Sequence, residues 1–297
     1  MKKRLLFHSL FAFGIALSSC VRDEILPCPP LQINLDVTDK NYFNIDEIPG
    51  ESRISENLPF KEYVSVLSYQ LRDASNGVVI VRKGPFRVDG NEQLYPIAFS
   101  DTLPHGTYVL TVWGGHETTL PLTADADSLC LHPDGYPNDD IYLTNDTLLY
   151  DATNYAYTAG LERTKGKLLV QVEKLMQGVS RVEQRVTRIW THVDRHFEYS
   201  RPDTVRQEHP MESGAGDDVL LRTCLAPSAM KENSKHQLRF YKGSQLVSSD
   251  KAACWVPLTL NRNEITLIKY ICPTDDYPRI FLWVNDNWEL IHQMEID

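Results

Sequence analysis

Several histidines and aspartates have the types and spacing that metal binding or catalysis would use. His192 and His196 are four residues apart, which on a helix would place both rings on one face. A metal site also needs a third ligand and supporting contacts, and the sequence around this pair offers neither. The acidic pairs Asp139-Asp140 and Asp275-Asp276 could supply two catalytic carboxylates, but both lie among turn-forming residues, where Asp is common for backbone reasons. We therefore expect no enzymatic activity, no metal and no cofactor.

Cys20 has the clearest chemistry, because it ends a segment built like an export signal. Basic residues 2–4 precede a mostly apolar run over 5–17, the pattern of a secretory signal peptide. The segment Leu17-Ser18-Ser19-Cys20 resembles the lipobox of bacterial lipoproteins, in which the thiol carries diacylglycerol and the cysteine becomes the first mature residue. Several acyl chains would anchor the protein, since each buried methylene contributes about 0.8 kcal/mol. The alternative is an ordinary signal peptide followed by a disulfide cysteine.

The residues after Cys20 bear on where the protein resides. Val21-Arg22-Asp23-Glu24 is loosely similar to the acidic surface-export signal of Bacteroidetes lipoproteins, and a solvated acidic linker is the alternative. The net charge of −10 becomes −13 once the three basic residues at 2–4 are removed. An acidic chain without a basic stripe argues against nucleic acid as a partner. We expect an outer-membrane lipoprotein at the cell surface.

The cysteines left after lipidation are odd in number, so at least one thiol would stay free. An exported protein can form disulfides, although their connectivity cannot be deduced from sequence. Cys28 and Cys130 lie in the first half and form one expected pair, and two of the last three cysteines would form another. No C-x-x-C spacing of a structural zinc site occurs. The five residues are Cys28, Cys130, Cys224, Cys254 and Cys272.

Period-two alternation of apolar residues dominates the chain and predicts strands. The segment 63–81 has the pattern of a hairpin that turns at Asn76-Gly77. A loop-rich break over residues 123–159 separates two strand-rich parts. We expect a signal peptide at 1–19 and two antiparallel sandwich domains at 20–158 and 159–297. The stretch LQINLDV shows the alternation well, with one face formed by Leu31, Ile33, Leu35 and Val37.

The segment VSRVEQRVTRIWTHVDRHF fits two kinds of structure. Its aliphatic residues recur at helical spacing, and by periodicity alone a helix is favoured. A strand would instead place alternate residues on one face and end at the turn RHFEY. The residues at helical spacing are Val179, Val182, Val186, Ile189 and Val193.

Four Asp-Ser/Thr-apolar triplets are more than composition predicts, since about one is expected. Each resembles the O-glycosylation acceptor of exported Bacteroidetes proteins, although turns at strand starts also favour Asp-Thr. The hydroxyl groups that would carry the glycan belong to Thr102, Ser128, Thr147 and Thr204.

Four stretches occur in an order similar to that of one family. They are PCPPLQINLDV after the lipobox cysteine, GTYVLTVWGG, TKGKLLVQVEKL and VNDNWEL. Together they resemble the Bacteroidetes fimbrial anchor lipoproteins from Cys20 to about Leu290. The resemblance implies an all-β fold of two tandem transthyretin-like antiparallel β-sandwich domains, without catalysis. It also implies a role in tethering a polymeric fimbrium to the outer membrane, with other fimbrial subunits as partners, and it favours a strand leading to an aromatic-rich turn over 186–199.

The C-terminal tail could bind an adjacent subunit by adding a strand to a sheet. Its alternation places four residues on one face, and the alternative is that the tail closes its own sandwich. Two rival functions remain. The five tryptophans could form a glycan-binding platform, or the protein could be a tip or stalk subunit released by proteolysis after an arginine such as Arg53. The four tail residues are Leu290, His292, Met294 and Ile296.

Overall fold

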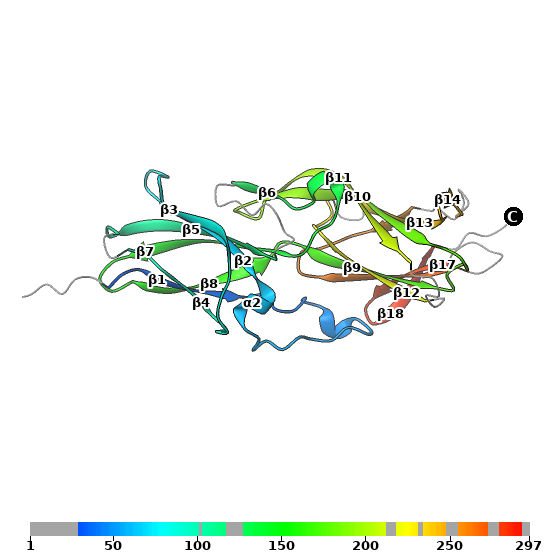
Figure 1. Cartoon of the computed structure of the whole chain (residues 1–297), viewed down its shortest axis with the longest axis horizontal. Coiled ribbons are helices and arrows are strands. Elements are labelled where there is room, and N and C mark those ends of the chain that lie inside the picture. The colour runs from blue at the N-terminus through cyan, green and yellow to red at the C-terminus, as the bar shows by residue number, and fades with distance from the viewer. Residues whose placement is uncertain are drawn as a thin grey trace, which may run out of the picture.

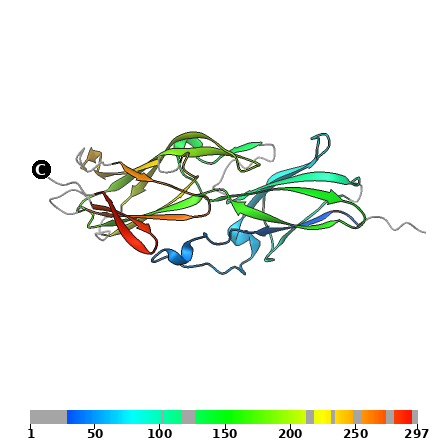
Figure 2. The same ribbon diagram turned by 180° about the vertical axis from the view of Figure 1, so that it is seen from behind.

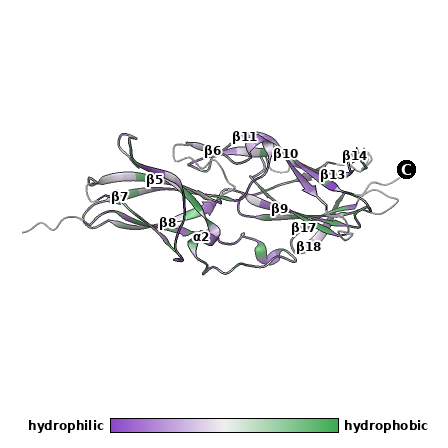
Figure 3. Ribbon diagram, viewed as in Figure 1, coloured by the Kyte–Doolittle hydropathy of each residue, from purple (hydrophilic) through white to green (hydrophobic). Residues whose placement is uncertain are grey.

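Alternating apolar residues build strands throughout the part of the chain that the computed structural model describes, residues 29–100, 103–116, 127–211, 218–230, 234–247, 255–272 and 279–292. The strands form two β-sandwich halves arranged along the long axis of the molecule (Figure 1). Figure 3 shows polar and apolar residues interleaved along the strands of both halves, as expected when one face of a strand packs inward. No helix in this part of the chain is long and apolar enough to cross a membrane. The expected all-β fold is confirmed.

The first half is a seven-stranded sheet, in the order β3-β2-β5-β7-β8-β1-β4, that folds over into two layers. The fold-over lies between β7 and β8, which share two residue pairs, whereas β5 and β7 share ten. The two layers enclose one core, to which β1, β2 and β5 contribute Leu35, Leu71 and Leu110. β1 runs parallel to β8. The strands are β1 (Gln32–Val37), β2 (Val66–Asp73), β3 (Val79–Arg87), β4 (Tyr95–Ala98), β5 (Gly106–Gly115), β7 (Ile141–Tyr150) and β8 (Ala156–Arg163).

Two local predictions in this half are confirmed. The apolar face of LQINLDV is buried along its whole length, from Leu31 to Val37. The hairpin forms between β2 and β3 and turns at Asn76-Gly77, where Gly77 has a φ of 73° and the Asn76 side chain accepts a hydrogen bond from the Val78 N–H. Its first strand begins later than predicted, because Phe60–Tyr63 form the helical turn α2.

The second half packs two sheets face to face around the core that includes Val170, Val186 and Leu238. One sheet has the order β11-β10-β13-β14, with β15 beside β13 and β6 beside β10; the other has the order β12-β9-β16-β17-β18. β9 and β16 are parallel. The elements are β6 (Ser128–Cys130), the 3-10 turn η2 (Pro133–Gly135), β9 (Gly166–Glu173), β10 (Arg181–Asp194), β11 (Tyr199–Pro210), β12 (Val219–Leu225), β13 (Ser234–Lys242), β14 (Gln245–Leu246), β15 (Val256–Leu258), β16 (Ile265–Ile271), β17 (Arg279–Val284) and β18 (Asn287–His292).

The chain passes between the halves later than the sequence indicates, and more than once. Residue 158 lies inside β8, and β9 of the second half begins at Gly166. The supposed loop region 123–159 contains β7, a central strand of the first half, and β6, which pairs with β10 of the second. The sequence of β7 resembles a loop because the centre of the strand is polar. Asn145 in this centre accepts a hydrogen bond from Thr111 on β5 at 2.7 Å. The interval 20–158 therefore includes a strand of the second sandwich.

The segment with two interpretations is the strand β10, as the family resemblance implies, and the helical count is wrong. Val182 and Val186 face the core until the pairing register with β11 shifts between Val186 and Ile189. This irregularity is a β-bulge, an extra residue in β10 that shifts the residues after it to the opposite face of the strand. Ile189 and Val193 are again buried. The resulting spacing of four, three and four residues imitates a helix.

Candidate functional site

Cys20, the predicted lipidation residue, lies outside the described residues, which begin at Pro29. β1 starts at the end of the first half that is remote from the second half, as Figures 1 and 2 both show. β17 and β18 lie in the other half, nearer the opposite end. A membrane attachment before β1 would therefore leave the second half facing away from the membrane.

Among the described strands β18 lies at an edge, because it pairs with β17 along one side and with no other described strand. Leu290 is 46% exposed, whereas the adjacent Ile291 packs against the core of the second half. This alternation agrees with the prediction that Leu290 and Ile291 lie on opposite faces. The side chain of His292, together with Met294 and Ile296, lies outside the described structure. Residues 287–292 pair within their own sheet, so a donated strand would come from the tail beyond them, or from a partner that pairs with β18.

Other sheet edges carry features that discourage pairing with another chain. β3 has register shifts in its pairing with β2 and contains Pro85 among basic residues. β4 has four residues, one of them Pro96. On β12, Arg222 forms an ion pair of 3.0 Å with Glu51 from the segment that follows β1. β18 has one charged residue, Glu289, and no proline. Its edge is thus the least protected of these four.

The segment between β1 and α2, residues 38–59, is here called the strap, because it reaches from the first half to the second. Asn44 exchanges two hydrogen bonds of 2.8 Å with the backbone of Ile265 on β16. The short turn η1 (Ile45–Glu47) lies on the outer face of β9 and β16, where Ile45 packs with Leu169. The Trp283 indole donates to the Glu47 carbonyl at 2.7 Å. The strap therefore fixes the first half against the second.

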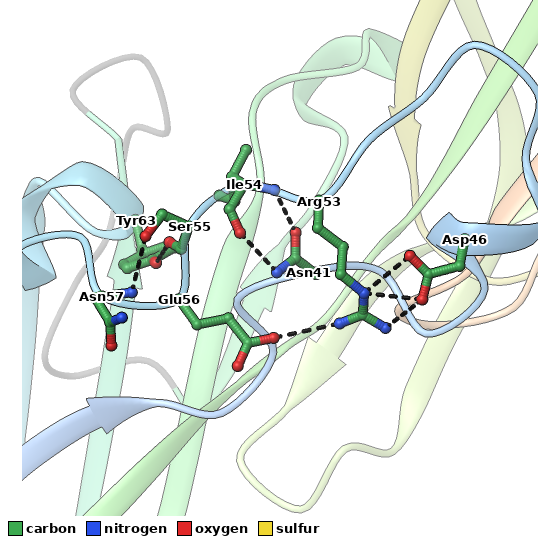
Figure 4. Close-up of polar contacts among 8 residues, drawn as sticks. All are labelled: Asn41, Asp46, Arg53, Ile54, Ser55, Glu56, Asn57 and Tyr63. Carbon is green, nitrogen blue, oxygen red and sulfur yellow. Dashed lines mark hydrogen bonds and ion pairs between the residues drawn. The ribbon is translucent and has the colours of Figure 1, made fainter.

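Arg53, the arginine after which proteolysis would cut, is held by the strap itself (Figure 4). Its guanidinium lies between Asp46 and Glu56, at 2.8 Å and 3.2 Å. The next residue, Ile54, exchanges two backbone hydrogen bonds with the Asn41 side chain. A protease that recognises arginine would have to displace both carboxylates. A cut here would also leave β1 bound between β8 and β4.

The tryptophans do not form the flat platform that glycan stacking uses. Trp283 and Trp288 are neighbours, with ring centroids 5.1 Å apart, but their planes meet at 72°. Both pack partly against the strap residues, and the Lys269 ammonium covers Trp288 at 4.3 Å. Trp113 is buried in the core, and Trp255 is 40% exposed. The near-coplanar exposed indoles expected for the glycan-binding rival do not occur among the described tryptophans.

The predicted modification sites lie in different settings. Thr102 and Cys28 lie outside the described residues. Ser128 and Thr147 are exposed and Thr204 is half-buried, so two of the three described hydroxyl groups are accessible. Cys130 lies on β6 in the second sandwich and is a free thiol among the residues described; its pairing with Cys28 stays a prediction. Cys224 and Cys272 are also free thiols within the described ranges, so they do not pair with each other. Cys254 lies outside those ranges, and a pair that includes it stays a prediction.

Within the described residues, the histidine and aspartate pairs do not gather into a group of metal ligands. His192 lies near the end of β10 and His196 in the following turn, and no group of three or more potential metal ligands occurs in the ranges described. Asp275-Asp276 lies outside those ranges. Asp140 instead forms a buried ion pair with Arg163 at 2.7 Å, and Tyr42 of the strap donates to the same carboxylate at 3.0 Å.

Sequence reasoning overlooked this junction cluster, which we define as Asp39, Tyr42, Asp140, Arg163 and Lys165. Burial opposes the charge on Arg163, but the Asp140 carboxylate together with Tyr142 and Tyr42 outweighs burial, and the pKa of Arg163 is raised. The guanidinium also lies 3.9 Å from the centre of the Tyr42 ring and donates to the Asp39 carbonyl. The cluster joins the strap, the start of β7 and the end of β8. Its one sequence signal was the pair Asp139-Asp140 in the segment before β7.

Comparison with known proteins identifies the fold. No family model and no curated protein matches the sequence. A candidate adhesin from Bacteroides thetaiotaomicron matches with a TM-score of 0.58 at 13% identity, covering 91% of this chain and 100% of that one. A candidate adhesin from Bacteroides ovatus matches with a TM-score of 0.55 at 12% identity, covering 92% and 98%. A candidate polysaccharide-binding protein from Bacteroides thetaiotaomicron gives 0.54 at 14%, covering 89% and 98%. The chain has the same fold as these proteins over nearly its whole length.

Proposed function

We propose that the protein is a lipid-anchored fimbrial subunit that tethers a fimbrium to the outer membrane and has no catalytic activity. The four sequence stretches that resemble fimbrial anchor lipoproteins support this function, as does the fold shared with candidate adhesins. The lipobox at Cys20 gives the attachment to the membrane, and the partners are other fimbrial subunits at the cell surface. The tip or stalk alternative is less well supported, because a cut after Arg53 would leave β1 bound between β8 and β4.

The observation that carries the proposal is the position of the β18 edge relative to the start of the chain. The described chain begins at the free end of one half, and β18 lies in the other half (Figure 1). A protein attached through its N-terminus would present this edge away from the membrane. An added strand would form many backbone hydrogen bonds at once, which suits a contact that must hold a polymer.

The first test is on the lipid attachment. Cys20→Ala should move the protein from the membrane fraction to the soluble fraction, because the variant lacks the acyl chains. Mass spectrometry should find Cys20 as the first residue of the mature wild-type protein, carrying diacylglycerol. A mature chain that starts elsewhere, or an unmodified Cys20 thiol, would show that the anchor is wrong.

The second test is on the β18 edge. Leu290→Glu places a charge on an exposed side chain, so the protein should stay folded and lipidated. Burial of a leucine contributes about 1.5–3 kcal/mol, so its loss at a contact should weaken retention of fimbriae on the cell by about tenfold or more. Fimbriae in the medium and on cells would be measured by immunoblot. Leu220→Glu is the matched control, because Leu220 is 39% exposed on β12, the opposite edge of the same sheet.

The two leucine variants separate the possible results. Shedding caused by Leu290→Glu and not by Leu220→Glu supports the β18 edge as the subunit contact. Equal retention in both variants would place the contact elsewhere. Shedding by Leu220→Glu alone would assign it to β12.

A further inference from the structure

Lys165 is a lysine without exposed surface at the passage between the two halves. It lies between β8 and β9, and its side chain is completely buried. Lysine is almost never fully buried without a charged partner. The three acceptors that its ammonium contacts are uncharged: the backbone carbonyls of Asn138 and Asp139, at 3.0 and 2.9 Å, and the side-chain oxygen of Asn138. An ion pair therefore does not explain why this lysine is buried. Its contact with Asn138 suggests a chemical reason instead.

The contact with Asn138 places an amine against a carboxamide. The Lys165 Nζ touches Asn138 Oδ1, so the carboxamide carbon Cγ is one bond away from the atom in contact. We propose that Lys165 and Asn138 form an intramolecular isopeptide bond between Nζ and Cγ. The bond would join the loop before β7 to the segment between β8 and β9. This proposal does not depend on the proposed function.

The reaction balances without a cofactor or an oxidant. The lone pair of the neutral Lys165 amine attacks Asn138 Cγ, and the bond between Cγ and Nδ2 breaks. The departing nitrogen takes up the proton that Nζ loses, so the products are a secondary amide and ammonia. Nothing is oxidised or reduced, and the chain becomes lighter by one NH3.

The surroundings increase the fraction of neutral amine, the form that the attack requires. Burial lowers the pKa of Lys165 to about 8, although Cys224 and the aspartates nearby partly oppose this effect. Water is excluded from a fully buried Nζ, so hydrolysis of the Asn138 carboxamide does not compete with attack by the amine. Burial also raises the pKa of Cys224 to about 11, which keeps its thiol protonated and leaves the lysine as the nucleophile.

Asp140 is the candidate carrier of the proton in this reaction. Its Oδ2 accepts hydrogen bonds from Arg163 and Tyr42, whereas its Oδ1 is buried and has no hydrogen-bond partner among the described residues. The Asp140 charge acts on Lys165. A carboxylate oxygen that is free in a buried site can take the proton from Nζ and return it to the leaving nitrogen.

The experiment is a peptide map of the full-length protein, digested under reducing conditions with trypsin and chymotrypsin. The expected result is a branched peptide that contains both residues, lacks one NH3 and resists tryptic cleavage after Lys165. Lys165→Met removes the nucleophile and Asn138→Ala removes the electrophile, so either variant should lose the branched peptide. The second variant keeps the lysine, which guards against failure of the first to fold.

Further variants sharpen the outcome. Asn138→Asp should still form the link, with loss of water in place of ammonia. Lys167→Met is the matched control, because Lys167 lies two residues on and contacts the Tyr42 ring at 4.6 Å; it should keep the branched peptide. Asp140→Asn should lower the linked fraction, and an unchanged fraction would remove Asp140 from the reaction. Linear Lys165 and Asn138 peptides at their unmodified masses in the wild type would overturn the proposal.

Discussion

At the scale of single residues, the structure depends on polar groups buried where the sequence gives no sign of them. His236 on β13 has no exposed surface and its Nδ1 lies 2.7 Å from the Tyr270 hydroxyl on β16. Its Nε2 has no hydrogen-bond partner in the described part of the chain. A ring in this position must stay neutral, because a charge there would have no counter-charge and little solvent. Burial accordingly lowers the pKa of His236 to about 3.

This burial predicts a dependence of stability on pH. The folded-state pKa is depressed from 6.5 to about 3, so between these values the unfolded chain binds a proton that the folded chain does not. Stability contributed by the neutral ring is fully present above about pH 6.5 and is lost as the pH falls towards 3, by about 1.4 kcal/mol per pH unit. His236→Phe should flatten the unfolding free energy in this range, as measured by urea denaturation from pH 7 to 4. Parallel curves for the variant and the wild type would contradict this account.

At the scale of elements, the strands with clean alternation could be predicted, and those whose pattern is interrupted could not. β1 and the β2–β3 hairpin followed from apolar alternation and from Asn76-Gly77, because one face of each packs against a core. β10 did not follow, since its bulge changes the face of later residues without a distinctive residue type. β7 has a polar centre that resembles a loop. The candidate edge could be predicted in part: alternation placed Leu290 and Ile291 on opposite faces, but only the structure shows that Leu290 is exposed and that β18 lies at an edge among the described strands.

The bulge in β10 offers a test of why the pattern failed. Arg188 lies within it and has a φ of 55°, a left-handed conformation that costs a residue with a Cβ about 1–2 kcal/mol. Its carbonyl accepts hydrogen bonds from Ala229 and Ser234, which hold the bulge in place. Arg188→Gly should leave the unfolding free energy unchanged or raise it by up to about 1 kcal/mol, because glycine adopts this conformation freely.

Arg188→Val serves as the comparison at the same position. A β-branched residue tolerates a positive φ poorly, so this variant should lose about 1–2 kcal/mol. Urea unfolding of the two variants gives the difference directly. Equal stabilities would mean that the bulge relaxes to suit its residue, and that its position is not fixed by the surrounding hydrogen bonds.

At the scale of the whole molecule, the two sandwiches are joined by more than a linker. The strap binds β16 and β17 of the second half, and β6 pairs with β10 before the chain returns to form β7. Trp113 of β5 and Leu143 of β7 belong to the same buried cluster as the core of the second half. The predicted intervals 20–158 and 159–297 therefore do not each contain a complete sandwich. This arrangement would suit a tether, because a force between its two ends must break several elements together.

These connections predict that the halves unfold as one cooperative unit. Differential scanning calorimetry of the wild type should show one transition with equal calorimetric and van't Hoff enthalpies. Asp140→Ala leaves Arg163, whose side chain is 5% exposed, without its counter-charge, and should lower stability by about 3–5 kcal/mol and separate the transitions. Glu162→Gln is the matched control, since its ion pair with Arg262 is exposed and should contribute about 0–1 kcal/mol. Two transitions in the wild type would mean that the junction cluster and the strap do not couple the sandwiches, and force would then open one half before the other.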